Sequence, residues 1–303
     1  MSHPQTILLE DTPTPSPSLL ALLQAHLPHS ITVLRHLQFA RNFPGGHTPS
    51  THILYARHAE EDNNNPPPIT TTTAPFAVAF VDLSRAPETQ LSLYSSLERA
   101  ANEATTTTTT EPEPNYYTWT TRPPQDETSL DLVLTLLRRI RALATTTTTT
   151  EAENPDPAPE NLTPLIGSLH ETVRQGLLAR GVRMAKSAAV PPGRAWEFCG
   201  KWLFRVEALL GGGEEEEGGG GGVVLLPEGA GWDRMRWGDA EVVQGRTSVR
   251  RLPETLLKLP STVVRLEDGT PIAWAFMGLD GTLMTLHVEV SADNNNYVVG
   301  QRR

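Results

Sequence analysis

The sequence has 303 residues, 38% of them hydrophobic and 20% charged, which is enough chain for one large domain or two smaller ones with buried cores. Its one cysteine, Cys199, excludes an intrachain disulfide, and its formal charge of −10 excludes the basic excess that draws proteins to nucleic-acid phosphates. A basic leader and an apolar run of about 20 residues are both missing, so we expect a cytoplasmic or nuclear protein with neither nucleic acid nor membrane as a partner.

The first 195 residues contain several stretches with the periodicity of helices or strands. Phe76–Asp82 is almost continuously apolar, as expected of a central strand covered on both faces. Ser129–Ala144 repeats leucine, valine and isoleucine at intervals of three and four, which predicts an amphipathic helix. The other predicted elements are a helical opening at Ser18–Leu27 and Ile31–Phe39, a strand at Thr51–Ala56 and a helix at Leu162–Leu178.

Tracts of one or two residue types interrupt these elements. They bury little apolar surface, whereas ordering a residue costs roughly 1–2 kcal/mol, so we interpret them as solvated loops. The tracts are Asn63–Asn65, Thr70–Thr73, Thr105–Thr110, Thr145–Thr150 and the Gly/Glu segment Gly211–Gly222, which we expect to be disordered.

From residue 200 onward the pattern indicates strands and tight turns. Lys201–Leu210 and Val223–Leu226 have the composition of strands, and Pro253 suits the first turn of a short helix. An antiparallel meander follows, because Glu267–Thr270 and Leu279–Gly281 supply two turns between three apolar runs. The three predicted strands are Ser261–Leu266, Pro271–Gly278 and Thr282–Val290.

This meander resembles the central strands of the GNAT superfamily of acyl-CoA-dependent N-acyltransferases. The resemblance lies in Leu259–Phe276 followed by Asp280–Val288, and it extends to Trp237–Val243 and Phe76–Asp82. These segments are most similar to the glycine N-acyltransferase-like branch, which includes uncharacterised fungal members. The resemblance implies an α+β fold with a GNAT-like mixed sheet and flanking helices.

The resemblance also implies a reaction in which an amine attacks the thioester of acyl-CoA directly, without a metal. In the family, the fourth strand presents backbone N–H groups to the pantetheine and to the thioester carbonyl, where the negative charge develops. That strand is Leu283–Glu289 here, which assigns contacts with acyl-CoA to Leu286, His287 and Val288. The co-substrate would be acetyl-CoA or another acyl-CoA, and the acceptor an amine, with a small amino-acid-like molecule as one candidate.

The sequence departs from the family where the pyrophosphate of CoA would bind. Family members continue after the fourth strand into a Q/R-x-x-G-x-G/A loop at a helix N-terminus, whose N–H groups hold the diphosphate. Only the opening of such a loop is present, at Gln301, Arg302 and Arg303. We therefore expect two acyltransferase-like halves, residues 1–195 and 200–303, of which the second is truncated, and no measurable binding of acetyl-CoA by this chain.

His287 and Glu289 alternate onto one face of the fourth strand, away from Leu286 and Val288, so either side chain could relay a proton from the amine. The alternative is that both are ordinary polar residues of a half-solvated strand. Trp274 either lines the acceptor pocket or fills the core. For the whole protein, an inactive fragment or a non-catalytic binding or scaffold protein remains the alternative to an N-acyltransferase.

Other reactive residues have simpler interpretations. Cys199 has no basic surroundings beyond Lys201, which is typical of a buried structural thiol. The carboxylates that follow the apolar strand are typical of helix caps and loops rather than of an amine-binding site; they are Asp82, Glu88 and Glu98. The histidines of the opening segment are irregularly spaced, so we expect no metal site.

Overall fold

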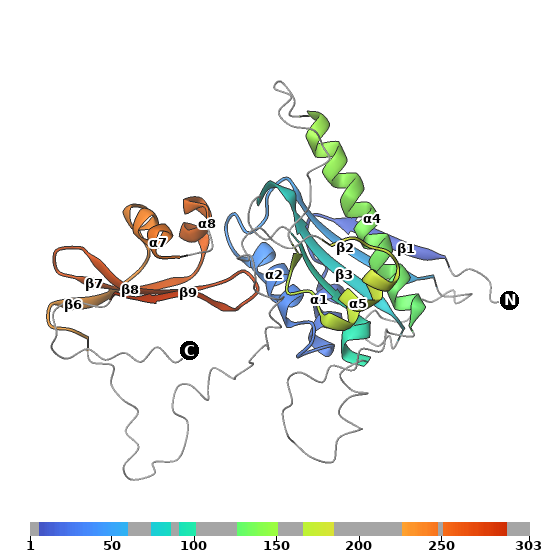
Figure 1. Cartoon of the computed structure of the whole chain (residues 1–303), viewed down its shortest axis with the longest axis horizontal. Helices are drawn as coiled ribbons and strands as arrows, with labels where there is room; N and C mark the ends of the chain where they lie inside the picture. The colour runs from blue at the N-terminus through green and yellow to red at the C-terminus, as the bar shows by residue number, and fades with distance from the viewer. Residues whose placement is uncertain are drawn as a thin grey trace, which may run out of the picture. The chain divides into compact units, whose positions relative to one another are not determined.

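The computed structural model describes residues 6–59, 74–85, 91–100, 126–150, 166–184, 226–247 and 251–289. The chain divides into two compact units. The first comprises Met1–Ser187 with Met277–Thr282, and the second comprises Ala188–Phe276 with Leu283–Arg303. Each unit combines a β-sheet with helices, so the fold is α+β (Figure 1).

The sheet of the first unit has its strands in the order β1-β2-β3-β4-β5. The first four strands pair antiparallel, and β5 pairs parallel to β4. Every residue of β3 is buried, which confirms the expected central strand. The strands are β1 (Ile7–Thr12), β2 (Thr51–His58), β3 (Phe76–Asp82), β4 (Leu91–Ser95) and β5 (Ile166–Gly167).

Helices α1 (Pro17–Ala25) and α2 (Ile31–Asn42) pack on one face of this sheet. Ser16 is the N-cap of α1, because its Oγ accepts a hydrogen bond from Leu19 N at 3.1 Å. The buried side chains between these helices and the strands include Leu22, Leu37, Val78 and Phe80.

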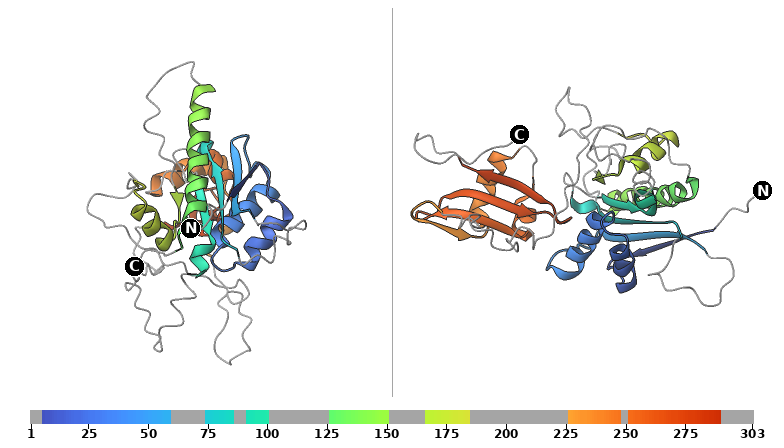
Figure 2. Two further views of the ribbon diagram at one scale, coloured as in Figure 1. Left: turned by 90° about the vertical axis from the view of Figure 1, so that its right-hand side faces the viewer. Right: turned by 90° about the horizontal axis from the view of Figure 1, so that it is seen from below.

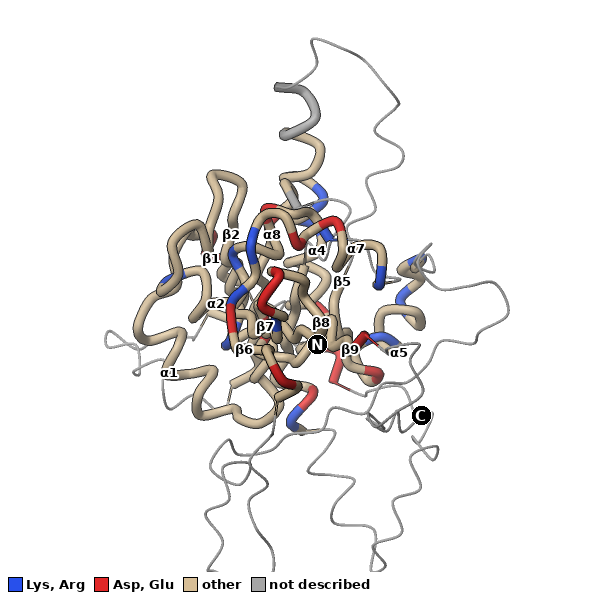
Figure 3. Tube along the Cα trace, turned by 90° about the vertical axis from the view of Figure 1, so that its left-hand side faces the viewer, with Lys and Arg blue, Asp and Glu red and all other residues tan. Residues whose placement is uncertain are grey.

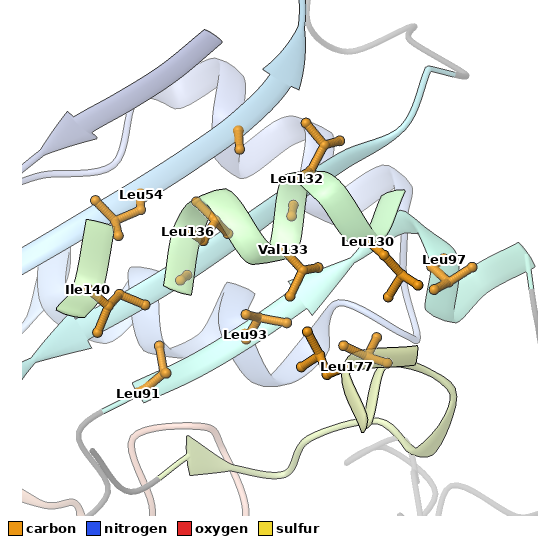
Figure 4. Close-up of a cluster of buried hydrophobic side chains, with 14 of the residues drawn as sticks. Leu54, Leu91, Leu93, Leu97, Leu130, Leu132, Val133, Leu136, Ile140 and Leu177 are labelled. Carbon is orange, nitrogen blue, oxygen red and sulfur yellow. The ribbon is translucent and has the colours of Figure 1, made fainter. Parts of the chain in front are cut away.

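The opposite face is covered by α4 (Glu127–Thr150) and α5 (Glu171–Ala179). Figure 4 shows α4 crossing the strands, with Leu132, Val133, Leu136 and Ile140 directed into the core beside side chains of β2 and β4. Because neighbouring residues of a strand point to opposite faces, β2 supplies Leu54 to this core and Ile53 to the other. The sheet is therefore buried on both faces.

Two sequence predictions in this unit differ from the structure. Thr145–Thr150 was expected to be a loop, yet its backbone continues α4 to Thr150. Thr145 and Thr146 donate their hydroxyl protons to carbonyls four residues earlier, which satisfies these side chains within the helix. The predicted helix Leu162–Leu178 is also shorter than expected, because β5 occupies Ile166–Gly167 and α5 begins at Glu171.

The second unit has a four-stranded sheet in the order β6-β7-β8-β9, where β6 pairs antiparallel to β7 and β7 antiparallel to β8. The meander predicted from the two turns is thus present. Helices α7 and α8 lie on one side of this sheet (Figure 1), and Figure 2 (right) shows the strands from the other side. The elements are β6 (Ala230–Asp233), a 3₁₀ turn (Trp237–Asp239), α7 (Ala240–Arg246), α8 (Pro253–Lys258), β7 (Ser261–Leu266), β8 (Pro271–Met277) and β9 (Leu283–Val288).

The two units share an order of elements. Among the described residues, β6-α7-α8-β7-β8-β9 repeats the order β1-α1-α2-β2-β3-β4, with the strands adjacent in the same sequence. No helix in the described part of the chain is long and apolar enough to cross a membrane. The predicted strands at Lys201–Leu210 and Val223–Leu226 and the Gly/Glu segment lie almost wholly outside the described residues.

Candidate functional site

Strand β9 carries the candidate site and is the edge strand of its sheet among the described residues. Glu289 N donates to Ile272 O at 2.8 Å, so this N–H group faces β8. Successive N–H groups of a strand point to opposite sides, which directs those of Leu286 and Val288 toward the free edge. These are two of the backbone positions that the family resemblance assigned to acyl-CoA.

Thr285 interrupts the regular geometry of β9. Its φ angle is 53°, in the left-handed region that a β-branched residue rarely adopts. A residue of this kind inside an edge strand is typical of a β-bulge, which re-aims the side chains that follow it. After Thr285, Leu286 and Val288 are exposed whereas His287 and Glu289 are half-buried, so the expected alternation is present.

His287 lies against Trp274 of the neighbouring strand β8. The two rings are stacked, with centroids 4.6 Å apart and planes inclined by 23°. Trp274 is 2% exposed, so it belongs to the core of the second unit rather than to an open pocket. Its indole Nε1 and the Nε2 atom of His287 are both buried without a hydrogen-bond partner among the described residues. The stack fixes the plane of the imidazole.

Glu289 is held by Arg246, the last residue of α7. Arg246 Nε donates to Glu289 Oε1 at 2.7 Å, and His287 Nε2 lies 3.5 Å from the same oxygen. The hydrogen bond from Arg246, together with the nearby positive charge, lowers the pKa of Glu289 below its ordinary value. The carboxylate is therefore ionised at neutral pH and a poor proton acceptor. Sequence patterns did not pair Arg246 with Glu289, because the two residues lie 43 positions apart.

A buried arginine links the same sheet to the start of helix α7. Arg265 on β7 makes two hydrogen bonds to Asp239, of 2.9 and 2.7 Å, and one of 2.8 Å to Asp233. It also donates to the carbonyl of Gly269 at 2.7 Å. The hydrogen bonds that Arg265 donates to Asp239 and Asp233 raise its pKa, so it stays charged. This cluster ties the residue before α7 to β6 and β7.

A shallow hollow of about 470 Å³ lies where β6 ends and β7 begins in the second unit, lined by Trp232, Asp233, Arg234, Ser261 and Thr262. Its one acidic side chain is already paired with Arg265 and Arg236, which leaves it little capacity to bind a further cation. Positive and negative positions are mixed along the trace of this unit (Figure 3). Neither the hollow nor the distribution of charge points to a polyanionic ligand.

The family model for the N-terminal domain of acyl-CoA N-acyltransferase verG matches residues 4–196, which is more than half of the chain. The chain belongs to this acyltransferase family. The matched region includes the sheet of the first unit and its two helical layers, and the mixed sheet with flanking helices agrees with the fold implied by the resemblance.

No curated protein matches this member of the family. Among solved structures, a Drosophila protein determined by a structural genomics consortium is similar at 12% sequence identity, over 92% of this chain and 77% of that chain, with a TM-score of 0.41.

Several candidate residues of the sequence lie elsewhere in this acyltransferase or outside its described residues. Cys199, Glu88 and the loop residues Gln301, Arg302 and Arg303 are among the residues that are not described. Asp82 is buried at the end of β3 and accepts hydrogen bonds from Thr48 and Ser84. Glu98 accepts one from Ser95 N at 3.0 Å. Asp82 therefore binds neighbouring hydroxyl groups, and Glu98 caps local backbone.

The histidines of the first unit contact other parts of that unit. His52 Nδ1 lies 2.8 Å from Asp11 Oδ1, and Arg139 of α4 donates to Asp11 Oδ2 at 2.7 Å. Burial raises the pKa of Asp11, but the hydrogen bonds from His52 and Arg139 outweigh it and lower that pKa. His26 Nδ1 lies 2.9 Å from the hydroxyl of Tyr94. The described residues contain no group of three His, Cys, Asp or Glu side chains that could hold a metal ion.

Proposed function

We propose that this acyltransferase transfers an acyl group, most simply acetyl, from acyl-CoA to a small amine, and that the reaction takes place at β9. The observation that carries the proposal is the combination of outward N–H groups at Leu286 and Val288 with a half-buried imidazole at His287. Membership of the acyl-CoA N-acyltransferase family supports acyl-CoA as the co-substrate.

The chemistry follows from these groups. The lone pair of the amine forms an N–C bond to the thioester carbon, the C–S bond breaks, and its electron pair leaves on the CoA sulfur. The outward N–H of Val288 donates to the carbonyl oxygen as it becomes an oxyanion, a contribution worth roughly 3–4 kcal/mol in other enzymes, and the outward N–H of Leu286 donates to the pantetheine. His287 takes the proton that the amine nitrogen loses.

The shared order of elements supports a chain of two acyltransferase-like halves, which we divide at about residues 195–200. We assign the diphosphate of CoA to Gln301, Arg302 and Arg303, in line with the family's loop. We also place the chain in the glycine N-acyltransferase-like branch, with an amino-acid-like acceptor, and in the cytoplasm or nucleus.

The test uses two acetyl donors: acetyl-CoA, and S-acetyl-N-acetylcysteamine, a short thioester without the diphosphate. The full chain is incubated with each donor and a panel of small amines, and the released thiol is measured. The proposal predicts amine-dependent release above that of the heat-denatured chain, reduced about 100-fold in His287→Gln. The short donor separates thioester chemistry at β9 from CoA recognition. Absence of release with both donors would support the non-catalytic alternative.

A further inference from the structure

The described structure brings three side chains together at the end of β9, from two elements that are distant in sequence. One carboxylate oxygen of Glu289 accepts a hydrogen bond from Arg246 at 2.7 Å and lies 3.5 Å from His287 Nε2. Within the described ranges, no other ion pair involves any of the three residues. Trp274, the group packed on the imidazole from β8, is uncharged.

The two nitrogens of His287 face different surroundings. Nε2 is buried and lies 3.5 Å from a carboxylate oxygen of Glu289, whereas the side chain as a whole is 26% exposed. Of the two ring nitrogens, Nδ1 is therefore the one left to face an incoming amine. A neutral imidazole carries one proton, on either of its two nitrogens. A neighbouring carboxylate favours the form in which the nitrogen facing it carries the proton. Proton-transfer sites are often looser without substrate, and a 3.5 Å separation falls within reach of closure to a hydrogen bond.

Arg246 determines where that carboxylate lies. The guanidinium of Arg246 donates a hydrogen bond to the same Glu289 oxygen that faces the imidazole. Arg246 is the last residue of helix α7, whereas Glu289 follows the end of strand β9, so the helix holds the carboxylate in place. The stack on Trp274 fixes the ring plane, and the ion pair fixes the carboxylate at its edge. Together they leave the imidazole one orientation.

We propose that Glu289, anchored by Arg246, is a positioning residue that keeps the proton of neutral His287 on Nε2, so that Nδ1 accepts the proton of the attacking amine. As the N–C bond forms, this proton passes from the amine nitrogen to Nδ1, and His287 then gives it to the departing CoA thiolate. The inference rests on the proposed function, and it assigns different roles to the two residues that the sequence treated as equivalent.

The first test is independent of turnover. In the full chain labelled with ¹⁵N-histidine, the Nε2–H proton of His287, which is buried beside the carboxylate of Glu289, exchanges slowly enough to be observed by NMR. The proposal predicts that this signal persists in Arg246→Lys, weakens in Arg246→Met and disappears in Glu289→Ala. Glu241→Gln, an exposed carboxylate on the same helix, is the matched control and retains the signal. Upfield ring-current shifts of His287 from Trp274 show that each variant keeps its fold.

The second test uses the thiol-release assay. Glu289→Ala lowers kcat about 10- to 100-fold with less than a threefold change in KM for the amine, and Arg246→Lys retains most of the activity. An Nε2–H signal that is absent from the wild type, or unchanged in Glu289→Ala, overturns the inference. If the wild-type chain shows this signal but releases no thiol, the proposed function fails while the positioning of His287 by Glu289 stands.

Discussion

Arg265 links strand β6, the residue before α7 and the turn between β7 and β8 in the second unit. Its side chain is 7% exposed and binds two carboxylates and a carbonyl, so its removal leaves buried charge without a partner. Breaking such a buried pair costs about 3–5 kcal/mol, whereas an exposed pair contributes less than about 1 kcal/mol.

We therefore expect Arg265→Met to lower the protection of the β7 amides against hydrogen exchange by about 3–5 kcal/mol. The amides of β3, in the other unit, are an internal reference. Arg236→Met, which removes an exposed partner of Asp233, serves as the control and should change the protection by less than about 1 kcal/mol. Equal effects of the two substitutions would contradict this role of Arg265.

The same cluster predicts a pH dependence. Burial raises the pKa of Asp239, but hydrogen bonds from Arg265 and from Arg236 N outweigh it and lower that pKa below its ordinary value. A carboxylate with a depressed folded pKa contributes stability above its unfolded value of about 3.9, and this stability is lost as the pH falls through the folded value.

Protection of the β7 amides should therefore be constant from pH 7 to about pH 5 and fall steeply below about pH 4. The dependence should flatten in Asp239→Asn, whose side chain does not titrate. A variant that retained the full slope would show that another group is responsible.

The residues that the sequence identified are those whose chemistry is local. Alternation along one strand places His287 and Glu289 on a common face, and the order of residues alone indicates this. Arg246 and Arg265 could not be found in the same way, because their partners lie 43 and 26 or more positions away and depend on packing. A charged side chain in a sequence shows no sign of being buried until its neighbours are known.

Strand β9 stores strain at Thr285. A non-glycine residue held at a φ of 53° costs roughly 1–3 kcal/mol, whereas glycine adopts this conformation freely at an entropic cost of about 0.5–1 kcal/mol. Replacement of Thr285 by glycine should therefore stabilise the second unit by about 1 kcal/mol. The matched substitution Thr262→Gly, at an exposed position of the regular strand β7, should destabilise it by about 0.5–1 kcal/mol. Hydrogen exchange of β8 amides measures both, and loss of stability in Thr285→Gly would contradict a strained site.

Helices and strands that have a clear hydrophobic period or a glycine turn beside them are predicted from the sequence, whereas elements without such features are missed. Two glycine turns fix the meander, and Gly269 and Gly281 both have the positive φ angles that such turns require. By contrast, β5 has only two residues and no periodicity to detect. The threonines that extend α4 have low intrinsic helix propensity, and the propagation of an existing helix overrides it.

In the chain as a whole, the family match and the candidate site fall in different units. The match spans residues 4–196, and β9 with its side chains belongs to the second unit. The two units have the same order of elements, and in this order β9 of the second unit corresponds to β4 of the first. Periodicity indicated the separate helices and strands, and the resemblance supplied the fold class and the chemistry. The contacts of the site required the three-dimensional structure.

The central claim is that thioester chemistry uses the outward backbone N–H groups of β9, and Val288 offers the most direct test. Proline at this position removes one outward N–H and leaves the hydrogen bonds to β8 in place, as edge strands tolerate. Val288→Ala, which keeps the N–H, is the matched control. With the short acetyl thioester and an amine, we predict thiol release near the wild-type rate in Val288→Ala and about 100-fold lower in Val288→Pro. Equal rates in the two variants would show that this backbone group is not used, and would contradict the placement of the reaction at β9.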